Sequence, residues 1–279
     1  MNVLIIGGGV IGLAAARELR LAGAGRVTVL EKGQAGREAS WAAAGMLAPD
    51  AETETVDAMY RLCRRSNELY PEFAASLFDE TGIDIELDRT GTICVAFSND
   101  DSEHLRRRMA AQQTAGISAE LLSSTNIAGL ESSLSPDVVG GVLYPDNGQV
   151  ENRKLVAALL EFALRNSIEV HENSPADELE IRNGRAVGLS VKGKSLEADA
   201  IVVAAGAWQS ELLDKANVGC PRVTPVKGQI IAYERVPSLR HVVYGAGGYL
   251  VPRRDGRLLV GATVEDAGFN TEVTAEAVL

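Results

Sequence analysis

The residues with the clearest chemical meaning lie at the start of the chain. Gly7-Gly8-Gly9-Val10-Ile11-Gly12 satisfies the spacing G-x-G-x-x-G, and the acidic Glu31 follows 19 positions after Gly12. In this pattern Gly7 makes a tight turn, Gly9 lets the backbone approach a pyrophosphate, and Gly12 lets a helix pack closely on a strand. The carboxylate of Glu31 suits the hydroxyls of a ribose. Together these residues predict a site for a nucleotide that contains adenosine diphosphate.

The elements expected around these residues fit the same prediction. Residues 2–6 are apolar and β-branched, which is typical of a buried parallel strand. Residues 10–21 indicate a helix whose N-terminal amides would face the phosphates, and residues 26–31 indicate a second strand. This βαβ context separates the motif from an ordinary glycine-rich turn. It does not distinguish NAD from FAD.

A second segment of small residues follows Glu31, at residues 38–49 (EASWAAAGMLAP). We expect a helix here whose Ala and Gly surface lets a flat group lie against the backbone. Its N-terminus, near Ser40, would add donors for a pyrophosphate. A helix packed inside the protein would need the same small residues, so composition alone leaves both interpretations open.

The remaining pattern predicts strand-rich material inserted into an α/β scaffold. The expected elements are mostly helix over 51–82, strands over 84–97, a helix over 100–115, turns over 134–150, a helix over 152–165, a hairpin over 175–191 with its turn at Asn183-Gly184, an apolar strand over 198–205, and further strands over 221–263.

The overall composition excludes some classes of partner. The chain has 279 residues, 27 of them basic and 38 acidic, and the resulting net charge of -11 would attract neither a nucleic acid nor an anionic membrane. Its three cysteines and three histidines are scattered, so we predict a reducing compartment and no metal site. There is no signal peptide with a basic start and no apolar run of roughly 18 residues. We therefore expect a soluble, cytoplasmic protein.

Several longer motifs resemble one known family. They are the GGGVIG start, REASWAAAGMLAP at 37–49, DAIVVAAGAW at 199–208, PVKGQ at 225–229 and YLVPRRDGRLLVGAT at 249–263. Together they resemble the D-amino acid oxidase superfamily, and most closely its bacterial glycine oxidases of thiamine biosynthesis, over essentially the whole chain. The resemblance implies non-covalently bound FAD. It also implies a Rossmann-like FAD-binding domain (1–86 and 148–217) interleaved with an antiparallel-sheet substrate domain (87–147 and 218–279).

The resemblance also places the expected contacts residue by residue. FAD contacts beyond the glycines fall on Val10, Ile11, Glu31, Lys32, Ala39, Ser40, Ala44, Gly45 and Met46, with a backbone contact near Ala176. Tyr244 and Tyr249 match the two tyrosines of the substrate pocket, and Lys227 and Gly228 match a signature without a catalytic role. No residue is predicted to act as a catalytic acid or base.

The implied reaction is the oxidation of glycine or another small amino acid to an imine, with electrons passing through FAD to molecular oxygen. Alternatives are a dehydrogenase for a D-amino acid or sarcosine that uses another acceptor, and an inactive FAD-binding fragment. The arginine that binds the substrate carboxylate in this family would lie beyond residue 279, and we read Arg253 and Arg254 as a solvated strand end. We therefore expect that the sequence is a fragment, half of a split enzyme or a naturally short protein. Its expected protein partner is either a second copy of the chain, in a homo-oligomer, or a chain that supplies the missing C-terminal segment.

Overall fold

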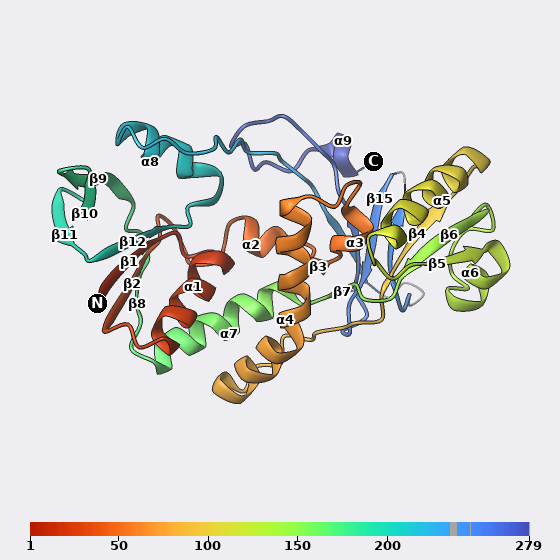
Figure 1. Cartoon of the computed structure of the whole chain (residues 1–279), viewed down its shortest axis with the longest axis horizontal. Coiled ribbons are helices and arrows are strands. Elements are labelled where there is room, and N and C mark those ends of the chain that lie inside the picture. The colour runs from red at the N-terminus through yellow and green to blue at the C-terminus, as the bar shows by residue number, and fades with distance from the viewer. Residues whose placement is uncertain (235–238, 246, 279) are drawn as a thin grey trace.

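A parallel sheet of four strands carries the N-terminal motif (Figure 1). The computed structural model describes residues 1–234, 239–245 and 247–278. The strand order is β12 (Ala200–Val203), β1 (Asn2–Ile6), β2 (Arg26–Leu30) and β8 (Glu169–His171), and every neighbouring pair is parallel. Parallel strands need long crossovers, and these bring distant parts of the chain to one sheet.

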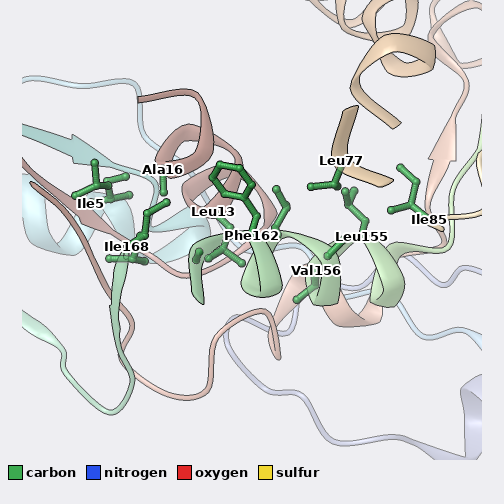
Figure 2. Close-up of a cluster of buried hydrophobic side chains, with 14 of the residues drawn as sticks. Ile5, Leu13, Ala16, Leu77, Ile85, Leu155, Val156, Phe162 and Ile168 are labelled. Carbon is green, nitrogen blue, oxygen red and sulfur yellow. The ribbon is translucent and has the colours of Figure 1, made fainter. Parts of the chain in front are cut away.

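Both faces of this sheet are buried, because successive side chains of a strand point to opposite sides. Val3 and Ile5 belong to the cluster formed with α1 (Val10–Leu21) and α7 (Asn152–Arg165), whose side chains interdigitate in Figure 2. Leu4 and Ile6 belong to a second cluster on the other face. That face is covered by the antiparallel sheet β9 (Ala176–Arg182), β10 (Arg185–Val191) and β11 (Lys194–Glu197), and by α8 (Gln209–Lys215).

A second, seven-stranded sheet lies at the other end of the molecule (Figure 1). Only the β14–β4 pair within it is parallel. Its order is β13 (Ile231–Tyr233), β16 (Leu258–Gly261), β15 (Gly248–Pro252), β14 (Val242–Gly245), β4 (Thr92–Ala96), β6 (Gly140–Tyr144) and β5 (Glu120–Ser123). The helices α5 (Asn99–Thr114) and α6 (Ser124–Leu130) accompany it.

Short elements and one long helix join the two sheets. The strands β3 (Met46–Leu47) and β7 (Gly148–Gln149) pair antiparallel between them. The helix α4 (Ala58–Thr81) begins at Asp57, whose side chain accepts a hydrogen bond from the Tyr60 amide, and ends at Gly82 in the left-handed conformation. The remaining elements are α2 (Ala39–Ala42), α3 (Pro49–Glu52), η1 (Gly206–Trp208) and α9 (Ala275–Val278).

The predicted fold class, a Rossmann-like α/β domain with an antiparallel sheet, is confirmed. The helix over 152–165 and the hairpin turn at Asn183-Gly184 are also found. The helix expected over 38–49 is wrong: it lasts one turn, and the chain then extends into β3. The division into 1–86 with 148–217 and 87–147 with 218–279 remains a prediction.

None of the helices in residues 1–234, 239–245 and 247–278 has both the length and the hydrophobicity that a membrane crossing requires. Within the same ranges, no group of three or more acidic, histidine or cysteine side chains is placed to hold a metal ion.

The ion pair between α1 and α4 provides a test of this packing. Arg17 is 4% exposed and donates hydrogen bonds to both carboxylate oxygens of Glu80, and its guanidinium lies over the rings of Phe73 and Phe162. We expect Arg17→Ala to lower the free energy of unfolding by about 2–4 kcal/mol, because it leaves a partly buried carboxylate unpaired. Chemical denaturation measures this free energy. Arg26→Ala, which removes only the exposed Arg26–Glu169 pair, is the control and should change the free energy of unfolding little.

The stabilisation of the fold by the Arg17–Glu80 pair should depend on pH. Partial burial opposes ionisation of Glu80, but hydrogen bonds from Arg17 and Ser76 prevail and lower its pKa. A lowered pKa means that the stabilisation is present at neutral pH and is lost as the pH falls through the folded-state pKa. The stability difference between the wild type and Arg17→Ala should therefore shrink in acid. A difference that stays constant down to low pH would contradict this assignment.

Candidate cofactor and substrate site

The glycine turn between β1 and α1 leaves no room for a side chain at Gly7 or Gly12. Gly7 has a φ of +105°, and a Cβ there would lie 2.3 Å from the carbonyl oxygen of Ala204. A Cβ on Gly12 would lie 1.9 Å from the carbonyl oxygen of Gly7. The first and last glycines of the motif are therefore required by contact between β1, β12 and α1, independently of any ligand.

The N-terminus of α1 presents unpaired backbone donors. Its N-cap, Gly9, supplies no side-chain cap, and the Val10 amide donates to the Ser40 hydroxyl at 2.9 Å. The amides of Ile11 and Gly12 have no acceptor among the described residues, and the Ile11 side chain beside them is 72% exposed. Free amides at the positive end of a helix dipole suit a pyrophosphate.

Glu31 lies at the end of β2, beside the glycine turn, and is 6% exposed. One carboxylate oxygen accepts the Gly8 amide at 2.8 Å, and the other accepts the Gly33 amide at 2.9 Å. Each oxygen can accept a further hydrogen bond. Glu31 thus holds the glycine turn in place and can still accept hydrogen bonds from a ribose. The glycines, the free amides and the buried carboxylate together fit the adenosine half of FAD.

Two other predicted cofactor residues, Lys32 and Ala176, have contacts of their own within the protein. The Lys32 ammonium lies 3.2 Å from the centre of the Trp208 ring and 3.6 Å from a Glu38 oxygen. Ala176 begins β9 and pairs with Val191. The Lys32 side chain is therefore engaged with η1, and any FAD contact by Lys32 or Ala176 remains a prediction.

The small-residue segment passes from the nucleotide end towards the second sheet. Ala39 and Ser40 lie in the single turn α2, so this segment offers no second helix N-terminus. Gly45 has a φ of +69°, and a Cβ there would lie 2.1 Å from the carbonyl oxygen of Val150. Close approach to the segment before α7, rather than helical packing, explains the glycine at this position.

A buried arginine holds this segment in place. Arg253, at the end of β15, is 8% exposed. Its guanidinium donates to the carbonyl oxygens of Ala44 at 2.8 Å and Val150 at 2.7 Å, and to the side chains of Gln149 and Asn152. Burial lowers its pKa, and no carboxylate lies within ion-pair distance among the described residues. The expectation of a solvated strand end is wrong for Arg253; only Arg254 is exposed, paired with Asp84.

Tyr244 and Tyr249 lie directly opposite each other on β14 and β15, with ring centres 6.0 Å apart. Tyr249 packs against the buried cluster that contains Ala44, and Tyr244 packs against the cluster that contains Ala48 and Ala51; Met46 borders both clusters. Burial raises the pKa of both phenols, so both are neutral donors at physiological pH. Neither hydroxyl has a hydrogen-bond partner among the described residues, which leaves both free for a ligand.

The sequence patterns missed one charged group near these rings. Glu52, the last residue of α3, acts electrostatically on both tyrosines and raises the pKa of each, although burial is the larger cause. The residue is exposed, yet enough protein surrounds its carboxyl that burial raises the pKa of that group. A single glutamate carries no sequence signal that could have identified it.

The predicted site residues therefore form one continuous track. Glu31 contacts Gly8, Ser40 contacts the start of α1, and Ala44 is held by Arg253. Met46 borders the same two buried clusters as the two tyrosines. Lys227 lies apart, where its ammonium contacts Glu265 at 3.4 Å and the carbonyl oxygen of Glu272 at 2.6 Å. Such a track suits a long dinucleotide that ends at a small pocket.

Comparison with known proteins shows the family of this chain. The family described as FAD dependent oxidoreductase (DAO) matches residues 2–279. A bifunctional protein ThiO/ThiG of Trichormus variabilis is 39% identical over 98% of this chain and 41% of its own length. The glycine oxidase of Pseudomonas aeruginosa is 37% identical over 99% of this chain and 74% of its own length.

Solved structures give the same result. The glycine oxidase from Geobacillus kaustophilus superposes with a TM-score of 0.92 at 33% identity, covering 99% of this chain and 75% of its own. The iminodiacetate oxidase from Chelativorans sp. gives a TM-score of 0.86 at 29% identity, with 76% of its chain covered. The chain thus spans 41% of the bifunctional relative and about three quarters of these oxidases.

The role of Glu31 can be tested by removing its carboxylate. Glu31→Ala leaves the Gly8 and Gly33 amides without their acceptor and removes the proposed ribose contact, so we expect FAD to bind about 1–3 kcal/mol more weakly. Flavin fluorescence measures the affinity, and thermal unfolding of the apoprotein measures the effect on the turn. Glu38→Ala, an exposed acid nearby, is the control. Unchanged FAD affinity in Glu31→Ala would rule out the ribose contact.

The hydrogen bonds of Arg253 to residue 44 and to residues 149–152, which we call the clamp, can be tested by a change that keeps the charge of this side chain. Arg253→Lys has one ammonium in place of the planar fork and cannot reach carbonyls on separate segments, so we expect a loss of about 1–3 kcal/mol of unfolding free energy. The visible spectrum of bound FAD should also shift, because the 44–46 segment is no longer fixed. Arg254→Lys is the matched control and should behave as wild type. Equal behaviour of the two variants would contradict the clamp.

Proposed function

Because this chain belongs to the family of FAD dependent oxidoreductases, we propose that it oxidises the amine of glycine or of another small amino acid. The observation that carries the proposal is the facing pair Tyr244 and Tyr249, which borders the same two buried clusters as Met46 at the end of the cofactor track. Two rings 6.0 Å apart with free hydroxyls suit a small polar substrate. The glycine oxidases among the relatives support the same substrate class.

In the proposed reaction FAD, when bound, takes up the hydride from the substrate carbon. The protein contributes position and charge. The free amides at the start of α1 hold the pyrophosphate, and Glu31 holds the ribose. Segment 44–46, fixed through Arg253, provides a rigid wall for the flavin, and the two neutral phenols orient the substrate by donating hydrogen bonds. Positioning of this kind lowers the barrier without a general base.

The carboxylate of Glu52 adds a local electrostatic effect beside the pocket. A negative charge there favours a substrate that arrives with a protonated amine and disfavours one with an acidic side chain. Deprotonation of the amine must precede hydride loss, because the nitrogen lone pair forms the new C=N bond.

The products follow from the balance of the reaction. Loss of hydride from the carbon of the neutral amine, and of a proton from nitrogen, leaves an imine. Water then converts it to glyoxylate and ammonia when the substrate is glycine. Molecular oxygen as acceptor takes up two electrons and two protons and gives hydrogen peroxide. We place the reaction in the supply of the imine for the thiazole of thiamine, in line with the ThiO/ThiG relatives.

The proposal predicts that glycine added without oxygen bleaches the flavin absorbance of the purified protein, and that air restores it with formation of peroxide. Tyr249→Phe keeps the ring and removes the hydroxyl, so we expect kcat/KM for glycine to fall about tenfold, the equivalent of one hydrogen bond. Tyr233→Phe, on the exposed edge strand β13, is the control.

Two outcomes would change the assignment. Bleaching without peroxide in air would indicate an acceptor other than oxygen. No bleaching by glycine, sarcosine or D-alanine in a protein that holds FAD would exclude the amine substrates.

A further inference from the structure

The PVKGQ motif at 225–229 takes no part in the cofactor track, yet it contacts a second segment of the chain along its whole length. This segment, residues 263–274, lies between β16 and α9. We call it the strap. Figure 1 shows it leaving the seven-stranded sheet and extending towards α8. Its contacts at both ends and at its tip indicate what it does.

Both ends of the strap are attached to the PVKGQ motif. At the first end, the backbones of Lys227 and Glu265 exchange hydrogen bonds at 3.0 and 2.9 Å, and their side chains form an ion pair at 3.4 Å. At the second end, the Lys227 ammonium donates to the carbonyl oxygen of Glu272 at 2.6 Å. The Gln229 side chain bridges the two ends, because it donates to a Glu265 oxygen at 2.6 Å and accepts from the Thr274 amide at 2.9 Å. Two side chains thus close the strap at its base.

The glycine of the motif permits this close approach. A Cβ on Gly228 would lie 3.1 Å from the carbonyl oxygen of Thr263, which is tighter than an ordinary van der Waals contact. Next to it, the Gln229 amide donates to the Thr263 hydroxyl at 2.9 Å. Attachment of the strap therefore accounts for the residues Lys-Gly-Gln of the motif without a catalytic role.

The tip of the strap reaches the nucleotide end of the molecule. The Phe269 ring stacks on the Trp208 ring, with centres 5.1 Å apart and an angle of 22° between the planes. The Trp208 ring also contacts the ammonium of Lys32, the residue that follows Glu31. A segment that continues from the second sheet thus holds two side chains at the edge of the first.

The stack lies where a dinucleotide would bind. In parallel α/β sheets, ligands bind at the carboxyl ends of the strands. Trp208 ends η1, which follows the carboxyl end of β12, and Ala204 between them borders Gly7 of the glycine turn. Phe269 remains 53% exposed, so its stacking adds little to the core. Its main effect is to restrict Trp208 and Lys32, and side chains that are restricted in advance lose less entropy when a ligand binds.

We propose that the strap retains FAD by holding Trp208 and Lys32 in place at the adenosine end of the cofactor track. Lys227 and Gln229 are then positioning residues, which act on FAD only through the strap. FAD is the cofactor of this family, so the role of the strap does not depend on which amine is oxidised. The rate at which FAD leaves the protein should therefore depend on residues 227 and 269, far from the glycine motif in the sequence.

Release of FAD from the purified holoprotein tests the strap. Phe269→Ala removes the stack at an exposed position, and we expect FAD to leave about three- to tenfold faster. Lys227→Met opens the base and should have an effect of about the same size. Flavin fluorescence after dilution measures the rate without any substrate, so failure of the proposed oxidation would not affect the result. Phe78→Ala on α4 and Lys215→Met on α8, both exposed, are the matched controls and should release FAD as wild type does.

Two further variants test the route of the effect. If Lys227 acts only by holding the strap, the double variant Lys227→Met/Phe269→Ala should release FAD no faster than the faster single variant. Multiplied effects would overturn the positioning role of Lys227. Phe269→Tyr keeps a stacking ring and should release FAD at the wild-type rate, and a rate equal to that of Phe269→Ala would contradict the stack. Wild-type release from Phe269→Ala would overturn the proposal as a whole.

Discussion

The join between the two sheets depends on one buried cation. Arg253 reaches from the end of β15 to the carbonyl oxygen of Ala44, and to Val150 and Asn152 at the start of α7. Its charge is balanced by the oxygens of carbonyl and amide groups, since no carboxylate in the described part of the chain pairs with it. Burial of a charge is tolerated only when such partners are present. The two terminal nitrogens of Arg253 have four acceptors, while its buried Nε has none among the described residues. Loss of any of them would separate parts of the chain that the site requires together.

This constraint explains how the site can span two sheets and still be rigid. The glycine turn belongs to the first sheet, and the tyrosine pair belongs to the second. Segment 39–46 runs between them and consists of the single turn α2, residues 43–45 and the first residue of β3. Its position is set at both ends, by Ser40 at the start of α1 and by Arg253 at Ala44. A cofactor that contacts both ends would find the distance between them already fixed, which is the basis of precise positioning.

The sequence predicts those parts of the site whose chemistry is local. The glycine motif and Glu31 could be identified because the turn, the helix and the strand follow one another within 31 residues. The path of segment 38–49 could not, because β3 exists only through pairing with β7, about a hundred positions away. The burial of Arg253 could not be predicted for the same reason: its acceptors come from residues 44 and 149–152. Burial of a charged side chain is decided by partners distant in sequence, and neither periodicity nor propensity reports them.

The long helix α4 shows a second limit of predictions from hydrophobic periodicity. Its pattern predicts an amphipathic helix but does not say which stripe faces the core, because an interface uses the same apolar residues as a core does. In its first half the core side is polar, and the apolar side faces outward. Which stripe of an amphipathic helix faces the core is therefore decided by the partners that the rest of the chain supplies, here the carboxylates of Asp50 and Asp146.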